Sequence, residues 1–202
     1  MSQLRRWILG GNLRPGDAVR QDAIASALEV SSVPVREALK VLASEGLVTY
    51  RPHHGYYVTK LTMRDIVEIY RIRELLESEA LRAGVPKLTE SHLEEMRQAL
   101  ADIDATDMDD IVAMTDANER FHMTLLSACE QPHLIKHIRL LRDSTHAYRS
   151  LYYLKGRIED IDHEHGAILK GAEQRDVEAV IEMTNAHREH TIETLRRFLP
   201  DE

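Results

Sequence analysis

Three histidines and an asparagine in the second half of the chain have the types and the spacing of a metal site. Asn118 and His122 are four residues apart, so on a helix their side chains project from the same face. His165 and His187 flank a turn at 175–176, so two antiparallel helices bring them to within about a turn or two of each other. Three imidazoles and an amide oxygen can hold a divalent metal in the core of a helical bundle and leave coordination positions open.

The chain contains eleven histidines, so most of them need no role in such a site. His163 projects from a different side of its helix than His165 and is expected to be a bystander. The residues interpreted as surface or hydrogen-bonded histidines are His133, His137, His146 and His190. Neutral imidazoles suit zinc, nickel, copper or iron, so the residues predict a transition metal without choosing among them.

A second functional pattern lies in residues 31–47, which have the sequence SSVPVREALKVLASEGL. Ser31 and Ser32 offer side-chain oxygens that can cap the start of a helix. Apolar residues then recur at helical spacing along one side, whereas Arg36 and Lys40 lie away from that side. The segment therefore predicts a short helix with one face in a core and a basic face free to contact a partner.

The segments on either side extend this helix into a DNA-binding unit. A short helix is expected at 21–28, one tight connection earlier, which makes a helix-turn-helix whose second helix enters the DNA major groove. Two β-prone runs at 47–50 and 55–59 follow as a hairpin, and a hairpin in this position forms a wing. The side chains that its loop offers to a phosphate or to the minor groove are those of Arg51, His53 and His54.

The run PGDAVRQDAIASALEVSSVPVREALKVLASEGLVTYRPHHGYYV resembles the N-terminal domain of the GntR family of bacterial transcription regulators, and the match covers nearly all of residues 1–60. The resemblance implies that Arg36 contacts a base or a phosphate in the major groove and that Lys40 makes a second contact one turn later. It also implies that the wing around His53 to Gly55 reaches into the minor groove. The family commonly has an arginine where this chain has Ser32, so one bidentate guanine contact is missing and a different operator is expected.

Composition and charge indicate a helical protein with two parts. Its 202 residues are 43% hydrophobic, 30% charged and only 5% aromatic, and no segment approaches the roughly eighteen apolar residues of a membrane helix. The single Cys129 excludes an intramolecular disulfide and fits a reducing cytoplasm. Residues 1–60 carry eight Lys or Arg and five Asp or Glu, whereas residues 61–202 carry eighteen and twenty-nine. A mildly basic head on an acidic body suits a DNA-binding domain joined to a sensing and dimerising domain.

From residue 62 onward the sequence predicts six amphipathic helices with brief connections, which pack as an antiparallel bundle. Their expected ranges are 63–83, 89–105, 108–129, 133–154, 158–171 and 176–199. The predicted fold class is therefore mainly α, with an N-terminal winged helix-turn-helix at 1–60 followed by an all-helical antiparallel bundle at 61–202.

The stretches NERFH and EHGAIL and the closing run from Asp176 to His187 resemble the metal-binding form of the FCD domain, the all-helical effector domain of the FadR subfamily of GntR regulators. The resemblance spans roughly residues 62–198. In that family an Asp or Asn and three His hold a metal, often zinc, whose free positions take the carboxylate of a small organic acid. The matching positions here are Asn118, His122, His165 and His187.

Two further expectations follow from this resemblance. Arg73, in the run RIRELLE, points into the cavity and holds the effector carboxylate with its fork of donors. The alternative for Arg73 is an ion pair with Glu77 one turn later. Asn118 stands where Asp is commoner, which leaves the site one negative charge poorer and the anion easier to admit. Zinc is the metal that the resemblance favours, with nickel or another transition metal as the alternative.

These features predict a cytoplasmic transcription regulator that acts as a homodimer, because one head reads only half of an operator. Its predicted partners are a double-stranded DNA operator and a small carboxylate effector, with no membrane. One alternative is a metal-dependent hydrolase whose metal activates water within the bundle. Against it, no carboxylate is spaced as a general base for the histidines, and Glu164 is expected to point elsewhere. Another alternative is a regulator whose metal is purely structural.

Overall fold

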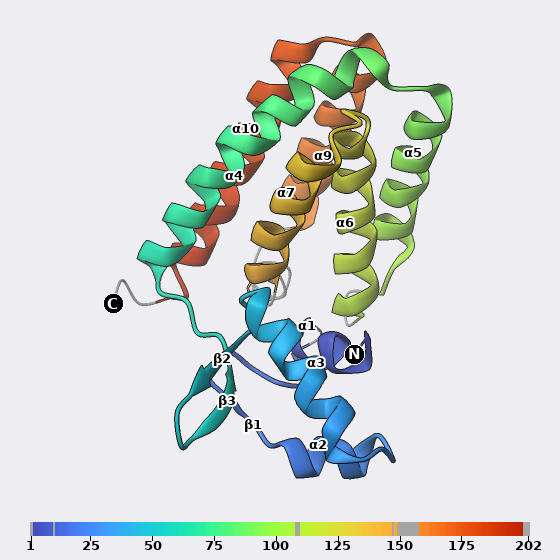
Figure 1. The fold of residues 1–202 in the computed structure, drawn as a ribbon. Coiled ribbons are helices and arrows are strands. Elements are labelled where there is room, and N and C mark those ends of the chain that lie inside the picture. The colour runs from blue at the N-terminus through green and yellow to red at the C-terminus, as the bar shows by residue number, and fades with distance from the viewer. Residues whose placement is uncertain (1, 10, 108–109, 147, 149–157, 200–202) are drawn as a thin grey trace.

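The structure, a computed structural model, places a small winged head at one end of a helical bundle (Figure 1). It describes residues 2–9, 11–107, 110–146, 148 and 158–199. The head consists of α1 (Ser2–Leu9), β1 (Ala18–Val19), α2 (Gln21–Ala27), α3 (Ser32–Ser44), β2 (Val48–Arg51) and β3 (Gly55–Val58). The bundle consists of α4 (Met63–Gly84), the 3-10 turn η1 (Val85–Lys87), α5 (Glu90–Ala105), α6 (Ile111–Ser127), α7 (Pro132–Ser144), α9 (Ile158–Gln174) and α10 (Val177–Arg196). The predicted fold class is confirmed.

The core of the head forms around the inward side of α3. Val35, Leu39 and Leu42 recur at helical spacing and are each at most 3% exposed. They pack in one cluster with Leu4 and Ile8 of α1, so α1 closes the core on the side of the bundle. The outward side of α3 is thereby held in a fixed orientation without contributing to the core.

The start of α3 and the sheet differ in detail from the sequence prediction. Ser31 is the N-terminal cap residue of α3, but its side chain makes no capping hydrogen bond, so the predicted serine cap is wrong there. The predicted hairpin is present, with Val48 opposite Val58 in the antiparallel pair of β2 and β3. A third strand, β1, pairs with β3 to give the order β1-β3-β2. Two residues are too few to show an alternating pattern, so the sequence does not reveal this strand.

Side-chain caps set where several bundle helices begin. Thr62 accepts a hydrogen bond from the Asp65 backbone N–H, and the Asp65 carboxylate accepts one from the Thr62 N–H at 2.8 Å. This capping box agrees with the predicted start of α4 at 63.

The predicted helix at 133–154 is shorter in the structure, because α7 ends at Ser144. Residues 149–157, and the predicted start of α6 at 108, lie outside the described residues.

Buried polar residues form a layer between two apolar clusters of the bundle. The cluster far from the head includes Leu81 on α4 and Phe121 on α6, and the cluster near the head includes Met63 and Tyr70 on α4. The polar side chains that lie between them and are at most 5% exposed include Arg73, Glu77, Asn118, His122, Arg142, Thr145, His146, His165, Thr184 and Arg188. A layer of this kind is unfavourable unless its groups satisfy one another or a ligand.

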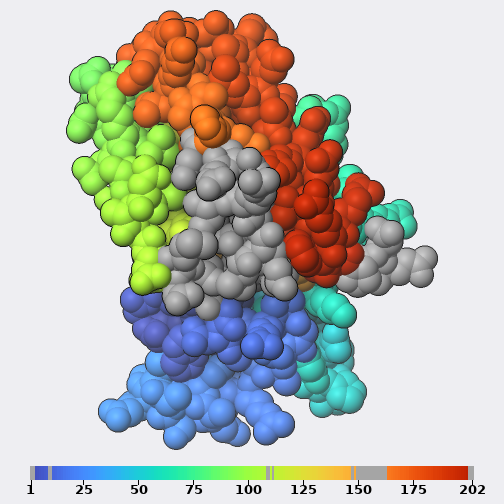
Figure 2. All heavy atoms as spheres, turned by 180° about the vertical axis from the view of Figure 1, so that it is seen from behind, coloured from blue at the N-terminus to red at the C-terminus, as the bar shows by residue number. Residues whose placement is uncertain are grey.

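The head lies against one end of the bundle (Figure 2). Arg5 of α1 pairs with Asp143 of α7 at 2.7 Å and with Glu45, just after α3, at 2.5 Å. In the connection to α4, the Leu61 N–H donates a 2.6 Å hydrogen bond to the hydroxyl of the buried Tyr148. Among the described helices, none combines the length and the apolar character needed to cross a membrane.

Candidate functional site

Three helices bring the predicted histidines together. His122 on α6, His165 on α9 and His187 on α10 each offer a ligand atom, and these atoms lie within 4.8 Å of one another. The Nε2 atoms of His122 and His165 are 3.2 Å apart. Two nitrogens bound tetrahedrally to one zinc at about 2.1 Å would be separated by about 3.4 Å, so the observed spacing fits a shared metal.

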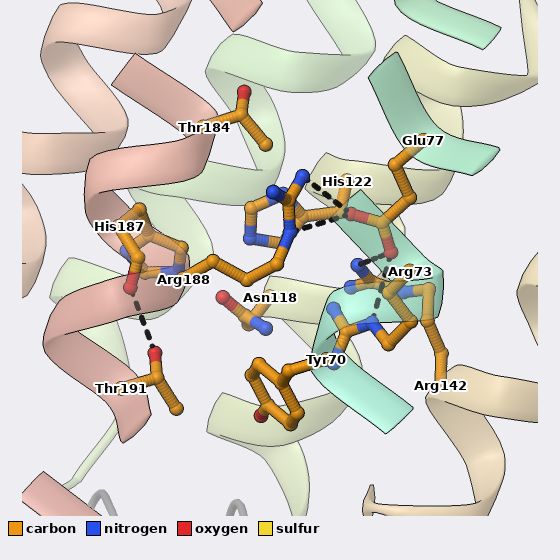
Figure 3. Close-up of a pocket in the computed structure, with 10 residues that line it drawn as sticks. All are labelled: Tyr70, Arg73, Glu77, Asn118, His122, Arg142, Thr184, His187, Arg188 and Thr191. Atoms are coloured by element: carbon orange, nitrogen blue, oxygen red, sulfur yellow. Dashed lines mark hydrogen bonds and ion pairs between the residues drawn. The ribbon is translucent and has the colours of Figure 1, made fainter. Parts of the chain in front are cut away.

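Asn118 lines the same cavity as His122 and His187. Asn118 lies one turn before His122 on α6 and is 3% exposed, and Figure 3 shows it between His187 and Tyr70. Its Oδ1 has no hydrogen-bond partner among the described residues. An unsatisfied buried acceptor costs about 1–3 kcal/mol, and most such atoms in proteins are paired. A metal ion, or a water bound to it, would satisfy this oxygen, so the donor set fits a metal.

Glu164 lies against the histidines, although the sequence led us to expect that it points elsewhere. Its carboxylate lies 2.6 Å from Nδ1 of His187 and 2.7 Å from Nδ1 of His190. Burial acts to raise the pKa of Glu164, but the hydrogen bonds from both imidazoles hold it below its usual value. A carboxylate on Nδ1 orients the ring of a metal-binding histidine and leaves Nε2 for the metal. Glu164 was missed because its partners are on another helix, where no sequence spacing indicates them.

Next to the histidines, three arginines converge on Glu77. Its carboxylate accepts hydrogen bonds from Arg73 at 3.0 Å, from Arg142 at 3.3 Å and from Arg188 at 3.1 Å. All four residues are at most 5% exposed. Burial acts to raise the pKa of Glu77, but the three guanidinium groups lower it to about 2. The ion pair of Arg73 and Glu77, expected as an alternative, is therefore present.

Two of the histidines and the arginine cluster line one small cavity (Figure 3). Its lining residues are Tyr70, Arg73, Glu77, Asn118, His122, Arg142, Thr184, His187, Arg188 and Thr191. Its free volume of about 20 Å³ is enough for a single water molecule. Arg73 thus lines the cavity and also pairs with Glu77. Sequence reasoning missed Arg142 and Arg188, because arginine is normally a surface residue and neither position carries a motif of its own.

The predicted DNA contacts of α3 lie on its outward side. Ser32 is exposed, and the side chains of Arg36 and Lys40 are 57% and 56% exposed. Both cations lie near Glu37, at 3.9 Å for Arg36 and 2.9 Å for Lys40. The hydrogen bond from Lys40 is the main cause of a lowered pKa of Glu37. DNA phosphates would compete with this carboxylate for both cations.

The remaining predicted contacts lie at the tip of the wing. Arg51 ends β2, and its guanidinium lies 4.3 Å from the centre of the Tyr57 ring. His53 and His54 are exposed in the loop that follows. His53 and Gly55 adopt left-handed backbone angles with φ of 63° and 87°, which allow the tight turn between the strands. The loop points away from the bundle (Figure 1).

Comparisons with known proteins identify both the head and the helical bundle. Residues 1–58 match the family described as bacterial regulatory proteins, gntR family, and residues 68–190 match the FCD domain. FCD domains are known to bind metals, and this one carries a cluster of three histidines. The solved structure of McbR/YncC from E. coli has the same fold, with a TM-score of 0.87 and 24% identity over 97% of this chain and 94% of that one.

Two relatives show what kind of protein this is. The HTH-type transcriptional regulator BphR of Paraburkholderia xenovorans is 30% identical, over 97% of this chain and 83% of its own length. The HTH-type transcriptional repressor RspR of Escherichia coli K12 is 27% identical, over 96% of this chain and 86% of its own length. Regulators of this family are not enzymes, which removes the hydrolase alternative. The chain belongs to the GntR family of bacterial regulatory proteins and is a DNA-binding transcription regulator with an FCD domain.

Proposed function

We propose that this regulator senses a small organic acid through a metal held in its FCD domain. The metal ligands are Asn118, His122, His165 and His187, and zinc is the favoured ion. The effector carboxylate occupies free positions on the metal and takes donors from Arg73. The observation that carries the proposal is the buried Asn118 oxygen, which has no partner among the described residues and lies beside three convergent histidines.

Charge supports an anionic effector. The four metal ligands are neutral, so a bound divalent ion keeps its full charge and offers open positions to a carboxylate oxygen. Among the lining residues, Arg73, Arg142 and Arg188 face the single carboxylate of Glu77. Arg142 also pairs with Glu119 at 2.8 Å, so one guanidinium charge remains in excess. Buried positive charge of this kind needs an anion. A small carboxylate provides one without bringing a large apolar surface into the cavity.

The cavity must open to admit this ligand, because about 20 Å³ holds only water. Arg73 and Arg188 both bind Glu77, at 3.0 and 3.1 Å. One of these guanidinium groups can leave Glu77 and bind the effector carboxylate, which replaces one ion pair by another of the same kind. Effector binding in this proposal therefore rearranges the arginine cluster.

The end of α7 contacts the arginine cluster and would therefore move with that rearrangement. Arg142, in its last turn, donates to Glu77 at 3.3 Å. Thr145 follows three residues later and receives a long contact of 3.5 Å from Nη1 of Arg73. A change in the partners of Arg73 thus changes the hydrogen bonds that hold the last turn of α7 in place.

This turn, and Tyr148 just after it, also contact the head and its connection to α4. Asp143 pairs with Arg5 of α1 at 2.7 Å, and the Tyr148 hydroxyl accepts from the Leu61 N–H at 2.6 Å. We propose that the effector shifts this end of α7 and so changes the position of the head. For that shift to regulate DNA binding, the effector must bind one arrangement of the heads better than the other.

We also propose a cytoplasmic homodimer in which residues 1–60 read DNA and residues 61–202 bind the effector and form the dimer. One head contacts only half of an operator, and two heads give the affinity that regulation requires. The head carries a net positive charge and the bundle a net negative one, so each part suits its proposed partner.

Metal analysis tests the proposal directly. The protein is purified without chelator or a nickel column, beside Asn118→Ala, a His122→Ala/His165→Ala double variant and the control His163→Ala. His163 is exposed on α9 and lies outside the cluster. We expect about one divalent ion per chain in the wild type and the control, and loss in the double variant. A native protein that carries no metal and cannot be loaded contradicts the proposal.

The small cavity favours a second candidate, a regulator with a purely structural metal. Melting temperatures of the metal-loaded protein, measured with a panel of small carboxylates, separate the two. A ligand that binds only the folded state stabilises it by about 2.7 kcal/mol at a hundred times its Kd. Stabilisation by one or more acids, reduced in Arg73→Gln, supports the sensor. Stabilisation by none supports the structural metal.

A further inference from the structure

Val33, in the first turn of α3, is an exposed apolar residue on the same side of the helix as the charged Arg36 and Lys40. Val33 is 56% exposed. Arg36 and Lys40 follow it by three and seven residues, so the three side chains lie along one face of the helix. This is the outward face of α3, on which Arg36, Glu37 and Lys40 are charged and exposed.

Folding provides no reason for a valine at this position. A β-branched residue is less favourable in a helix than alanine, and an exposed one gains nothing from burial. Val33 is also outside the core that the described residues of the head form, whereas Val35 belongs to it. The nearby exposed Val30 lines an apolar groove together with Val35 and Ala38, and Val33 is not part of that lining.

DNA provides a reason. The residues at the start of a recognition helix are those that reach base edges in the major groove. The apolar feature displayed there is the C5-methyl group of thymine, which cytosine and uracil lack. Ser32, the residue before Val33, has a short side chain that leaves the approach to the groove open.

We propose that Val33 packs against a thymine methyl group and selects thymine at one base pair of the sequence read by each head. Arg36 and Lys40, further along the same face, supply charge for phosphates and guanine. Val33 supplies discrimination between thymine and cytosine. Burying one methyl group is worth about a fourfold change in affinity.

Deoxyuracil isolates this contact, because it removes the methyl group and leaves the base pairing unchanged. An operator is first selected from random duplexes with the full-length protein, and each thymine is then replaced in turn by deoxyuracil. Binding is measured for the wild type, for Val33→Ala and for the control Val41→Ala. Val41 is a 40% exposed valine on the same helix, two turns further from its start.

We expect one thymine in the sequence read by each head at which deoxyuracil weakens the wild type about fourfold. Val33→Ala should bind the thymine operator about fourfold more weakly and lose its sensitivity to deoxyuracil at that position, whereas Val41→Ala keeps it. Circular dichroism of Val33→Ala should match the wild type. Two results would overturn the proposal: a wild type that is insensitive to deoxyuracil at every thymine, or a Val33→Ala variant that keeps the full sensitivity.

Discussion

The outward face of α3 and the arginine cluster of the bundle use the same residue types in opposite surroundings. On α3, Glu37 lies between Arg36 and Lys40, and all three side chains are more than half exposed. In the bundle, Glu77 lies among Arg73, Arg142 and Arg188, and all four residues are buried. Water screens the first group, so its ion pairs are weak and can be exchanged for DNA phosphates. The second group depends on its internal partners, because buried charges without them are very unfavourable.

The largest effect expected from this contrast is that of Glu77→Gln. The substitution leaves Arg73 and Arg188 around a neutral amide, whereas Arg142 keeps its pair with Glu119. It should lower the free energy of unfolding by about 3–5 kcal/mol. The matched control is Glu37→Gln on α3, which should leave the melting temperature unchanged and strengthen non-specific DNA binding by removing a competing carboxylate. Thermal melts and gel shifts of both variants test this. Equal melting temperatures for the two variants would break the comparison.

Acid should weaken the buried group in a defined pH range. The pKa of Glu77 is about 2 in the folded protein, against an ordinary value of 4.5. Because the folded value is the lower one, the stabilisation is present above about pH 4.5 and is lost as pH falls toward 2, by an amount on the order of 3 kcal/mol. Carbon-13 NMR of protein labelled at glutamate measures this pKa. A Glu77 carboxyl that titrates near 4.5 in the folded protein would contradict the proposed ion cluster.

On the exposed face the effects should appear in DNA binding alone. Arg36→Ala is expected to weaken operator binding by about 1–3 kcal/mol if the guanidinium contacts a guanine. Lys40→Ala should weaken operator and random DNA alike and reduce the slope of log affinity against log salt by about 1. Gel shifts at several salt concentrations, with metal analysis as the control, check both. Unchanged operator affinity in Arg36→Ala would remove this residue from the interface.

The smallest expected effect lies where the head is joined to the bundle. Tyr148→Phe removes the hydroxyl that binds the Leu61 backbone and should lower stability by about 1 kcal/mol. It should also reduce the factor by which metal and effector change operator affinity, because that hydroxyl joins the segment just after α7 to the connection before α4. Operator affinity measured with and without ligand gives this factor for each protein. An unchanged factor would place the coupling elsewhere.

Much of the architecture was predictable because it depends on neighbours in the sequence. The apolar spacing of Val35, Leu39 and Leu42 defines one side of α3, and the cap at Thr62 defines the start of α4. Likewise, the positions of His165 and His187 around one turn were enough to expect them on facing helices. The strand β1 was missed because two residues carry no periodic signal, and the end of α7 because no glycine or proline marks Ser144.

The sequence by itself determined the family, the mainly α fold class and the set of residues with metal-binding chemistry, because each depends on local motifs and helical periodicity. Only the tertiary structure showed that Glu164 binds His187 and His190 and that three arginines share Glu77. The cavity volume of about 20 Å³ also became visible only there. Contacts between helices depend on the rotation and tilt of each helix, which packing of the whole core decides. For the same reason, only the structure showed that the last turn of α7 contacts both the arginine cluster and the head.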